Sequence, residues 1–475
     1  MNVRNGRLLL MVVAGTLVGC STVFRAREAQ ESLAPKGEEA ASAAGAARVD
    51  LRGRSLEDLV AFAWTNRPSV VSKTLAVRDA RLALKALAAD APVLSETPWT
   101  APNLSISGGH SESGESVHFE DLDARTSGSP SAALSLELLV YDFGRNAAKA
   151  RAQAEAVVAA ERALAEEGLS VFRTTAEAYF DFLERRALLE VAQTNVLQHA
   201  EHLKRADERL HFGEASQLDV LKARLDLAQA RQQAVSASNL VDTAGATLLR
   251  ELGVDASRGT WATVFGTEPV GIGAVRRGFA ATDEGVEAAF AFARTNAPAV
   301  RVARARLRAA SHAVDAAVAD LYPSVSATAS LSWTDPLWVF RWGFSASQSL
   351  FQGFRKTTAV DRAVVALESA AADVDEAEQA LSVELETAIA NRDNAREAVA
   401  SARASLRSAA ENLATVRVQF AVGSASRVEL SEAIASDSQA RGDCISAFYD
   451  GQRAEAALFA LTGRSPRYRE ETVRE

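Results

Sequence analysis

The sequence predicts a mainly α-helical fold that contributes a few β-strands to a transmembrane β-barrel. The 475 residues are 48% hydrophobic but only 6% aromatic, so alanine and leucine supply much of the apolar content, as in long packed helices. Residues 146–210 and 356–420 contain no proline, which allows two helices of about 65 residues, or ~100 Å, each. Around residues 324–347, apolar and polar side chains alternate with the period of a β-strand.

The N-terminus carries a bacterial secretory signal, predicted over residues 1–19. Arg4 and Arg7 precede an apolar run, and the segment ends in Leu17-Val18-Gly19-Cys20, which resembles a lipobox. We therefore expect cleavage before Cys20, and acyl chains, palmitate among them, that anchor this cysteine. Residues 20–50 then form a lipidated tether, and cleavage without lipidation is the alternative. No other stretch has the 18 or more apolar residues of a spanning helix.

From about residue 51 the sequence is internally duplicated. Three segments recur, the first at a distance of 230 residues and the other two at 210, so the first copy is 20 residues longer between them. They are Phe62–Val70 with Phe292–Val300, Gly213–Asp219 with Gly423–Glu429, and Leu248–Gly253 with Leu458–Gly463. We predict a first structural repeat over residues 51–253, a linker over 254–281, a second repeat over 282–463 and a tail over 464–475.

Each repeat contains two predicted strands with one apolar and one polar face, the pattern of a transmembrane barrel. The predicted lipid-facing residues are Leu134, Leu136 and Leu138 in the first repeat, and Val325, Leu331, Trp333, Trp338, Phe340, Trp342 and Phe344 in the second. Within residues 91–131, the segments 108–114 and 126–130 have the composition of a long polar loop. A soluble hairpin packed on helices would also alternate, but tryptophans gathered at the strands favour a membrane interface.

Four strands per chain cannot close a barrel, because the smallest barrels of this kind have about eight strands. An open sheet edge in lipid would leave backbone groups without hydrogen bonds. Several chains must therefore share one barrel, and a homotrimer would supply twelve strands.

The long proline-free segments predict helical hairpins. Apolar residues recur every seven positions in both repeats, as in a coiled-coil seam. Gly213 and Gly423 are predicted to end the long helices at the hairpin-tip turns, and Ser216 and Ser426 to start the return helices. Each repeat therefore contains one long helical hairpin.

Charge and motifs argue against several classes of function. The formal net charge is -9 and acidic and basic residues are interspersed, so no basic patch indicates nucleic-acid binding. No phosphate loop, nucleophile elbow or catalytic cluster is present in the sequence, and we expect neither an enzyme nor a cofactor. His199, His202 and His211 have a spacing that could suit a metal. A packing role is favoured instead, and no metal site is predicted.

The duplicated order of helix, two strands, long helix, glycine turn and return helix resembles the TolC-type outer-membrane efflux duct family, in its lipoprotein subgroup. Residues 139–145 and 349–355, Leu-Val-Tyr-Asp-Phe-Gly-Arg and Ser-Leu-Phe-Gln-Gly-Phe-Arg, are similar to the strand-to-helix junction of that family. The resemblance implies a trimeric 12-stranded barrel in the outer membrane and an α-helical tunnel in the periplasm. It further implies passive conduction of drugs or metals delivered by an inner-membrane pump and a periplasmic adaptor. A duct for type I protein secretion and a structural coiled-coil lipoprotein are the alternatives.

The same resemblance implies a periplasmic gate at the tip of the second hairpin. Glu429 and Glu432 match the positions of paired carboxylates, commonly aspartates, that ring the closed entrance in the family. At spacing i and i+3 they lie on one helix face, and three chains would place six carboxylates around one axis, favouring cations. The alternative is that Ser426 and Glu429 form a capping box that only shapes the tip.

Overall fold

The computed structural model describes residues 55–89, 103–113, 127–212, 216–254, 261–265, 291–293, 295–334 and 337–462. The predicted signal peptide, Cys20, the tether, Gly213, most of the linker and the tail lie outside the described residues.

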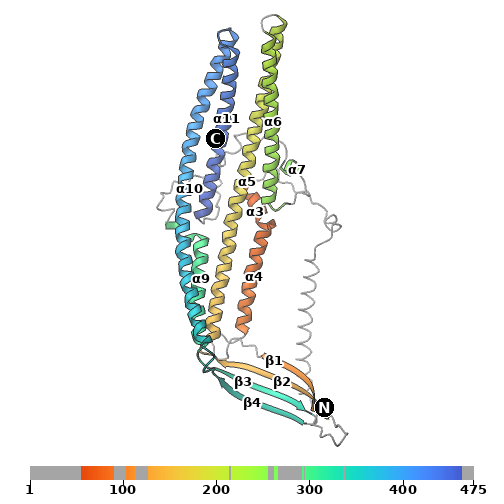
Figure 1. Cartoon of the computed structure of the whole chain (residues 1–475), viewed down its shortest axis with the longest axis vertical. Coiled ribbons are helices and arrows are strands. Elements are labelled where there is room, and N and C mark those ends of the chain that lie inside the picture. The colour runs from red at the N-terminus through yellow and green to blue at the C-terminus, as the bar shows by residue number, and fades with distance from the viewer. Residues whose placement is uncertain are drawn as a thin grey trace, which may run out of the picture.

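Two units with the same order of elements follow each other (Figure 1). The first contains α3 (Leu56–Asn66), α4 (Pro68–Ala89), β1 (Asn103–Ser113), β2 (Ser127–Tyr141), α5 (Arg145–His211) and α6 (Gln217–Glu251). After the short α7 (Trp261–Phe265), the second contains α9 (Pro298–Ala319), β3 (Ser324–Thr334), β4 (Leu337–Ser347), α10 (Arg355–Ala421) and α11 (Arg427–Thr462). The predicted fold class, mainly α with duplicated helical hairpins and four strands, is confirmed.

The long helices give the molecule its length. α5 and α10 each contain 67 residues, which corresponds to ~100 Å at the usual rise per residue. The sheet lies at one end of the long axis and both hairpin tips lie at the other (Figure 1). Residues of the predicted seams, such as Phe182 in α5 and Leu385 and Leu413 in α10, are buried, because each long helix packs along its return helix.

Local chemistry sets the ends of these helices. α10 ends beside Gly423, whose φ of 79° is the left-handed conformation that closes many helices. α6 begins after Ser216, whose hydroxyl accepts a hydrogen bond from the Asp219 N–H at 3.3 Å. The Asp219 carboxylate in turn accepts one from the Ser216 N–H at 3.2 Å, which completes a capping box.

The four strands form one antiparallel sheet in the order β1-β2-β3-β4. β3 and β4 occupy the segments predicted from their alternation. The predicted polar loop is wrong at residues 108–113 and 127–130, which pair with each other or with their neighbours in the β1–β2 ladder. Strand pairing uses main-chain groups only, so small residues extend a hairpin once apolar neighbours have set its register.

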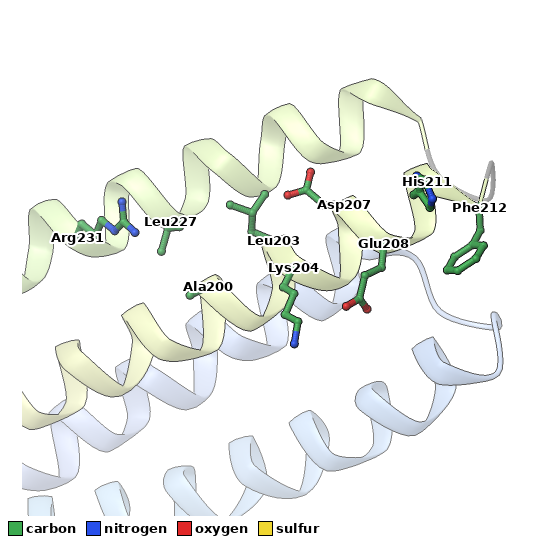
Figure 2. Close-up of a pocket in the computed structure, with 9 residues that line it drawn as sticks. All are labelled: Ala200, Leu203, Lys204, Asp207, Glu208, His211, Phe212, Leu227 and Arg231. Atoms are coloured by element: carbon green, nitrogen blue, oxygen red, sulfur yellow. The ribbon is translucent and has the colours of Figure 1, made fainter.

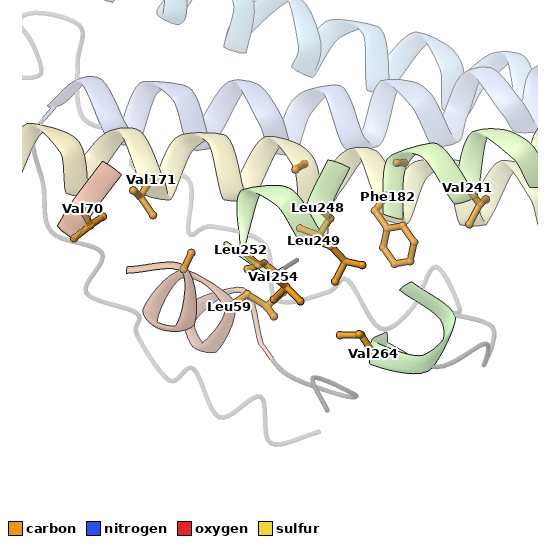
Figure 3. Close-up of a cluster of buried hydrophobic side chains, with 13 residues drawn as sticks. Leu59, Val70, Val171, Phe182, Val241, Leu248, Leu249, Leu252, Val254 and Val264 are labelled. Carbon is orange, nitrogen blue, oxygen red and sulfur yellow. The ribbon is translucent and has the colours of Figure 1, made fainter. Parts of the chain in front are cut away.

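A hydrophobic cluster at mid-length holds the first unit together (Figure 3). It joins Leu59 of α3, Phe182 of α5, Leu248 of α6 and Val264 of α7. The Trp261 ring lies over Gly245 of α6, where an added Cβ would meet the Trp261 Cγ at 2.5 Å. The close approach therefore requires glycine at this position.

A buried polar network connects the two units. The Ser446 hydroxyl of α11 donates to the Glu184 carboxylate of α5 at 2.8 Å, and the Arg453 guanidinium contacts the same carboxylate at 2.7 Å. Burial, with smaller contributions from Tyr179 and Glu184, raises the pKa of the nearby Tyr449 to about 12. Because a buried carboxylate is costly without partners, this network fixes the register of α11 on α5. Among the described residues, no helix combines the length and apolarity needed to cross a bilayer.

Candidate functional site

The register of the sheet gathers the predicted apolar residues on one face, because directly paired residues in an antiparallel sheet project to the same side. One row joins Ile106, Leu134, Leu331 and Phe340. The other rows on this face are Leu104–Leu136–Ala329–Trp342, Leu138–Ala327–Phe344, Ala132–Trp333–Trp338 and Tyr141–Val325–Ala346. Every residue predicted to face lipid lies in one of these rows.

The opposite face is polar. One of its rows joins Ser105, Ser135, Ser330 and Arg341, and the Ser105 and Ser135 hydroxyls are 2.7 Å apart. The next row joins Glu137, Thr328 and Gly343. The remaining rows on this face add Ala133, Leu139, Leu337 and Val339 among serines and Thr334. The sheet therefore has one apolar face and one face on which hydroxyls predominate.

In β4 the described residues of the chain leave the apolar face uncovered. The side chains of Trp338, Phe340, Trp342 and Phe344 in β4 are 65–73% exposed. An exposed apolar patch of this kind marks a contact with a membrane or another protein. The exposure suits a surface that borders an apolar medium.

At the tip of the second hairpin, the structure places Glu429 in a capping box. Its carboxylate accepts a hydrogen bond from the Ser426 N–H at 2.7 Å, and the Ser426 hydroxyl accepts one from the Glu429 N–H at 3.2 Å. Glu429 and Glu432 are both exposed. The capping role is therefore present, and both carboxylates remain accessible at the tip.

Arg427 ties the two hairpin tips together, and sequence reasoning missed it. Its guanidinium lies 3.4 Å from the Asp226 carboxylate and 3.6 Å from that of Asp219, both in α6. Hydrogen bonds from Ser216, with a smaller contribution from Arg427, lower the pKa of Asp219. The seven-residue spacing of these two acids on one face of α6 is the sequence feature that could have indicated a basic partner.

His202 packs between the two hairpins. Its ring centroid lies 5.9 Å from that of Phe420 in α10. Burial lowers the pKa of His202, repulsion from the nearby His199, Arg205 and Arg427 side chains lowers it further, and the Asp226 carboxylate opposes them. In the described part of the chain, no group of three or more potential metal ligands comes together.

A groove of about 780 Å³ runs along the first hairpin near its tip (Figure 2). Its lining combines apolar and charged side chains from α5 and α6. They are Ala200, Leu203, Lys204, Asp207, Glu208, His211, Phe212, Leu227 and Arg231. Phe212 is 76% exposed at the end of the groove, which suits contact with a protein surface.

A family model described as "Outer membrane efflux protein" matches residues 70–254 and 292–464. Among solved structures the chain is similar to CusC, with a TM-score of 0.74, 19% identity and coverage of 88% of this chain and 93% of that chain. It is also similar to the outer membrane protein VceC from Vibrio cholerae, with a TM-score of 0.71, 16% identity and coverage of 86% of this chain and 96% of that chain. A third similar structure is the CmeC outer membrane channel from Campylobacter jejuni, with a TM-score of 0.70, 16% identity and coverage of 86% of this chain and 85% of that chain. No curated protein matches significantly.

Proposed function

Because the chain belongs to the outer membrane efflux protein family, we propose that it is the outer-membrane channel subunit of a tripartite efflux system. It passively conducts small molecules, drugs or metals, which an inner-membrane pump and a periplasmic adaptor deliver. Members of the family are channels and not enzymes. The observation that carries the proposal is the two-faced sheet, because lipid on one face and water on the other is the environment of a barrel wall.

The arrangement of the helices and strands supports a closed ring of identical subunits. Near the sheet, α4 packs on α5, α5 on α9 and α9 on α10, and near the tips α6 packs on α5, α5 on α11 and α11 on α10. One edge of the protomer is therefore formed by β4 and α10, and the other by β1, α4 and α6 (Figure 1). Two different edges that pair head to tail generate a closed ring when the rotation permits.

Both edges carry exposed apolar side chains. On α6 they include Leu218, Leu221 and Leu225, at the spacing of a coiled-coil seam, and α10 exposes Val383 and Val418. We propose that these edges meet in a homotrimer, whose three sheets supply a 12-stranded barrel and whose helices form a tunnel.

Electrophoresis and bilayer recordings test this proposal. Protein extracted in mild detergent should migrate as an oligomer when unheated and as a monomer after boiling, because barrel strands shared between chains resist dissociation. The oligomer should form conducting channels in planar bilayers. A protein that stays monomeric and conducts no current would refute the channel.

We propose that acylated Cys20 anchors the mature N-terminus in the outer membrane. Each buried CH₂ of an acyl chain contributes roughly 0.8 kcal/mol, so the lipid aids sorting while a trimeric barrel holds the membrane unaided. Cys20→Ser should abolish labelling by a radioactive fatty acid and leave the oligomer in place. Labelling that persists in Cys20→Ser would exclude this anchor.

We propose that Glu429 and Glu432 form a carboxylate ring at the periplasmic entrance. Their exposure at the start of α11 supports this, and the capping box orients the first of them. Wild-type channels should prefer cations and be blocked by multivalent cations from the periplasmic side. Glu429→Gln combined with Glu432→Gln should lose that block and keep the fold, because glutamine still satisfies a capping box. If multivalent cations still blocked this variant, the carboxylate ring would be excluded, and the two residues would serve only to shape the hairpin tip.

We further propose that the adaptor docks on the hairpin tips. The groove beside α5, with exposed Phe212 at its end, offers apolar contact within a charged rim. A photo-crosslinking residue at Phe212 should capture the adaptor in cells, whereas one at Tyr322, at the opposite end of the helices, should not. Equal capture at both positions would exclude this docking mode.

A further inference from the structure

The polar face of the sheet carries one acidic and one basic side chain. Among the strand residues whose side chains are described, Glu137 in β2 and Arg341 in β4 are the only ones with a full charge, and both are exposed. Their neighbours on this face are mostly serine and threonine. Two long charged side chains therefore project from a surface of short hydroxyls.

The register of the strands keeps the two charges apart. Arg341 pairs with Ser330, and Ser330 pairs with Ser135. Glu137 lies two residues beyond Ser135 on β2. With ~4.8 Å between strands and ~3.4 Å between residues, the backbones of Arg341 and Glu137 are ~12 Å apart. Neither side chain forms an ion pair or hydrogen bond with another described residue, so each charge is unpaired in this part of the chain.

An adjacent copy of the chain would not bring an acid to Arg341 either. In the proposed ring, β4 of one copy meets β1 of the next, and the β1 positions on the polar face hold only uncharged residues. Glu137 of that copy belongs to the strand after β1. It would lie two strands away from Arg341, which is ~10 Å or more.

The order of the strands places these charges at equal steps around such a ring. Each copy has the order β1-β2-β3-β4, with the acid on the second strand and the base on the fourth. In twelve strands, acids and bases therefore alternate at every second strand, three of each. Twelve strands ~4.8 Å apart and tilted by ~40° enclose a barrel ~24 Å across. The six charges leave its wall with separate positive and negative sectors and no net charge.

Each sector keeps its own field in a water-filled lumen of this width. The Debye length of ~8 Å at physiological ionic strength is shorter than the distance between neighbouring opposite charges. A unit charge ~5 Å from an ion in salt water changes the local concentration of that ion by about twofold. Anions should therefore gather beside the arginines and cations beside the glutamates, whereas the two effects oppose each other toward the axis.

We propose that Arg341 and Glu137 give anions and cations separate paths along the barrel wall, so that the exit of the channel passes small solutes of either charge. This inference rests on the proposed function, because it requires the polar face to line a water-filled lumen. It differs from the proposed carboxylate ring at the periplasmic entrance, where charges of one sign favour cations. The charge preference of the channel is then set at the entrance, and the exit does not reinforce it.

Two positions on β3 allow a direct test of the sectors. Ser330 pairs with Arg341, and Thr328 pairs with Glu137. Ser330→Cys and Thr328→Cys are introduced singly into the full chain with Cys444→Ala, and the reconstituted oligomer reacts with thiosulfonates of similar size, one anionic and one cationic. The ratio of the anionic to the cationic rate should be higher at position 330 than at position 328 by roughly fourfold or more, because the two local potentials have opposite signs. The Cys444→Ala chain without a new cysteine gives the background rate.

Salt and charge removal supply the controls. In 1 M salt, where the Debye length is ~3 Å, the two ratios should converge. Arg341→Gln should lower the ratio at position 330, and Arg341→Lys should keep it. Equal ratios at positions 328 and 330 in 0.1 M salt, or a difference that survives Arg341→Gln combined with Glu137→Gln, would overturn the separate paths. If neither cysteine reacted above background, the polar face would not line water and the proposed function itself would fail.

Bilayer recordings test the consequence for transport. The Glu429→Gln/Glu432→Gln channel is the background, so that the entrance adds no charge preference. In it, Arg341→Gln should lower the permeability of chloride relative to potassium by about twofold, and Glu137→Gln should raise it by a similar factor. Arg341→Gln combined with Glu137→Gln should restore the ratio and lower the conductance in 0.1 M but not in 1 M KCl.

The recordings also separate this inference from the channel as such. Channels that conduct with an unchanged permeability ratio in both single variants would overturn the inference and leave the proposed function intact. An undiminished conductance of the combined variant in 0.1 M KCl would mean that the two charges neutralise each other, which would also overturn the separate paths.

Discussion

The substitution Phe340→Arg tests whether the apolar face of the sheet lies in lipid, because a charge placed in lipid should reduce assembly of the oligomer. At ~3.4 Å per residue and a tilt of ~40°, the 11 residues of β4 rise about 26 Å, close to the ~25 Å apolar band of a membrane barrel. Phe340 is then about 8 Å from the outer boundary of that band. An arginine at the midplane costs roughly 2–4 kcal/mol, and this intermediate depth places the cost near 2 kcal/mol per chain, or about 6 kcal/mol for three chains.

That loss is comparable with the whole stability of many folded proteins, about 5–15 kcal/mol. Phe340→Arg should therefore deplete the heat-modifiable oligomer in outer-membrane extracts. Thr328→Arg is the matched control, because Thr328 lies on the polar face and pairs with Glu137 and Gly343, so the new charge has water and an acid beside it. Greater loss in Thr328→Arg than in Phe340→Arg would mean that the faces are reversed, and equal assembly would mean that neither borders lipid.

Three further predictions concern the helices. Gly245→Ala should lower the stability by roughly 1–3 kcal/mol through overpacking against Trp261, read from the denaturant midpoint, whereas Gly442→Ala, whose added Cβ would meet its nearest neighbour at 3.7 Å, should be neutral or stabilising. Arg427→Gln should weaken the link between the tips by about 1 kcal/mol, because its partly exposed ion pairs are screened; unchanged hydrogen exchange at the start of α11 would contradict this. His202, with its lowered pKa, should make the fold less stable as pH falls below ~6.5, since the unfolded chain binds the proton more readily, and His202→Gln should remove that dependence.

The sequence predicted best what depends on neighbours in the chain. The absence of proline located α5 and α10 to within a residue or two, and strict alternation located β3 and β4, because helix and strand periods are local properties. The first hairpin was predicted less well. Its apolar alternation is confined to a few residues such as Leu104 and Leu134, and glycine and serine in the rest of its strands carry no pattern of burial.

Features that depend on distant contacts could not be predicted in the same way. Arg427 meets Asp226 across 201 positions of sequence, and only the packing of both α11 and α6 on α5 brings them together. The left-handed conformation of Phe143 and Phe354 is likewise hidden, because phenylalanine carries no preference for it. The glycine beside each phenylalanine indicates a turn, but it does not indicate that the phenylalanine adopts the left-handed conformation as well.

Duplication explains the similar helices but not the chemistry of the two tips. Gln217 occupies in the first hairpin the position that Arg427 has in the second, and Lys222 occupies that of Glu432. The first tip therefore supplies acids to the arginine of the second, while the second carries the exposed pair Glu429 and Glu432. Because one hairpin contacts the other through Arg427, we expect a change at this link to move the two acids relative to the axis of the proposed trimer. The residues that differ between the repeats are therefore the ones that matter at the second tip. Arg427, which links the tips, and Glu429 and Glu432 of the proposed carboxylate ring all lie at the start of α11.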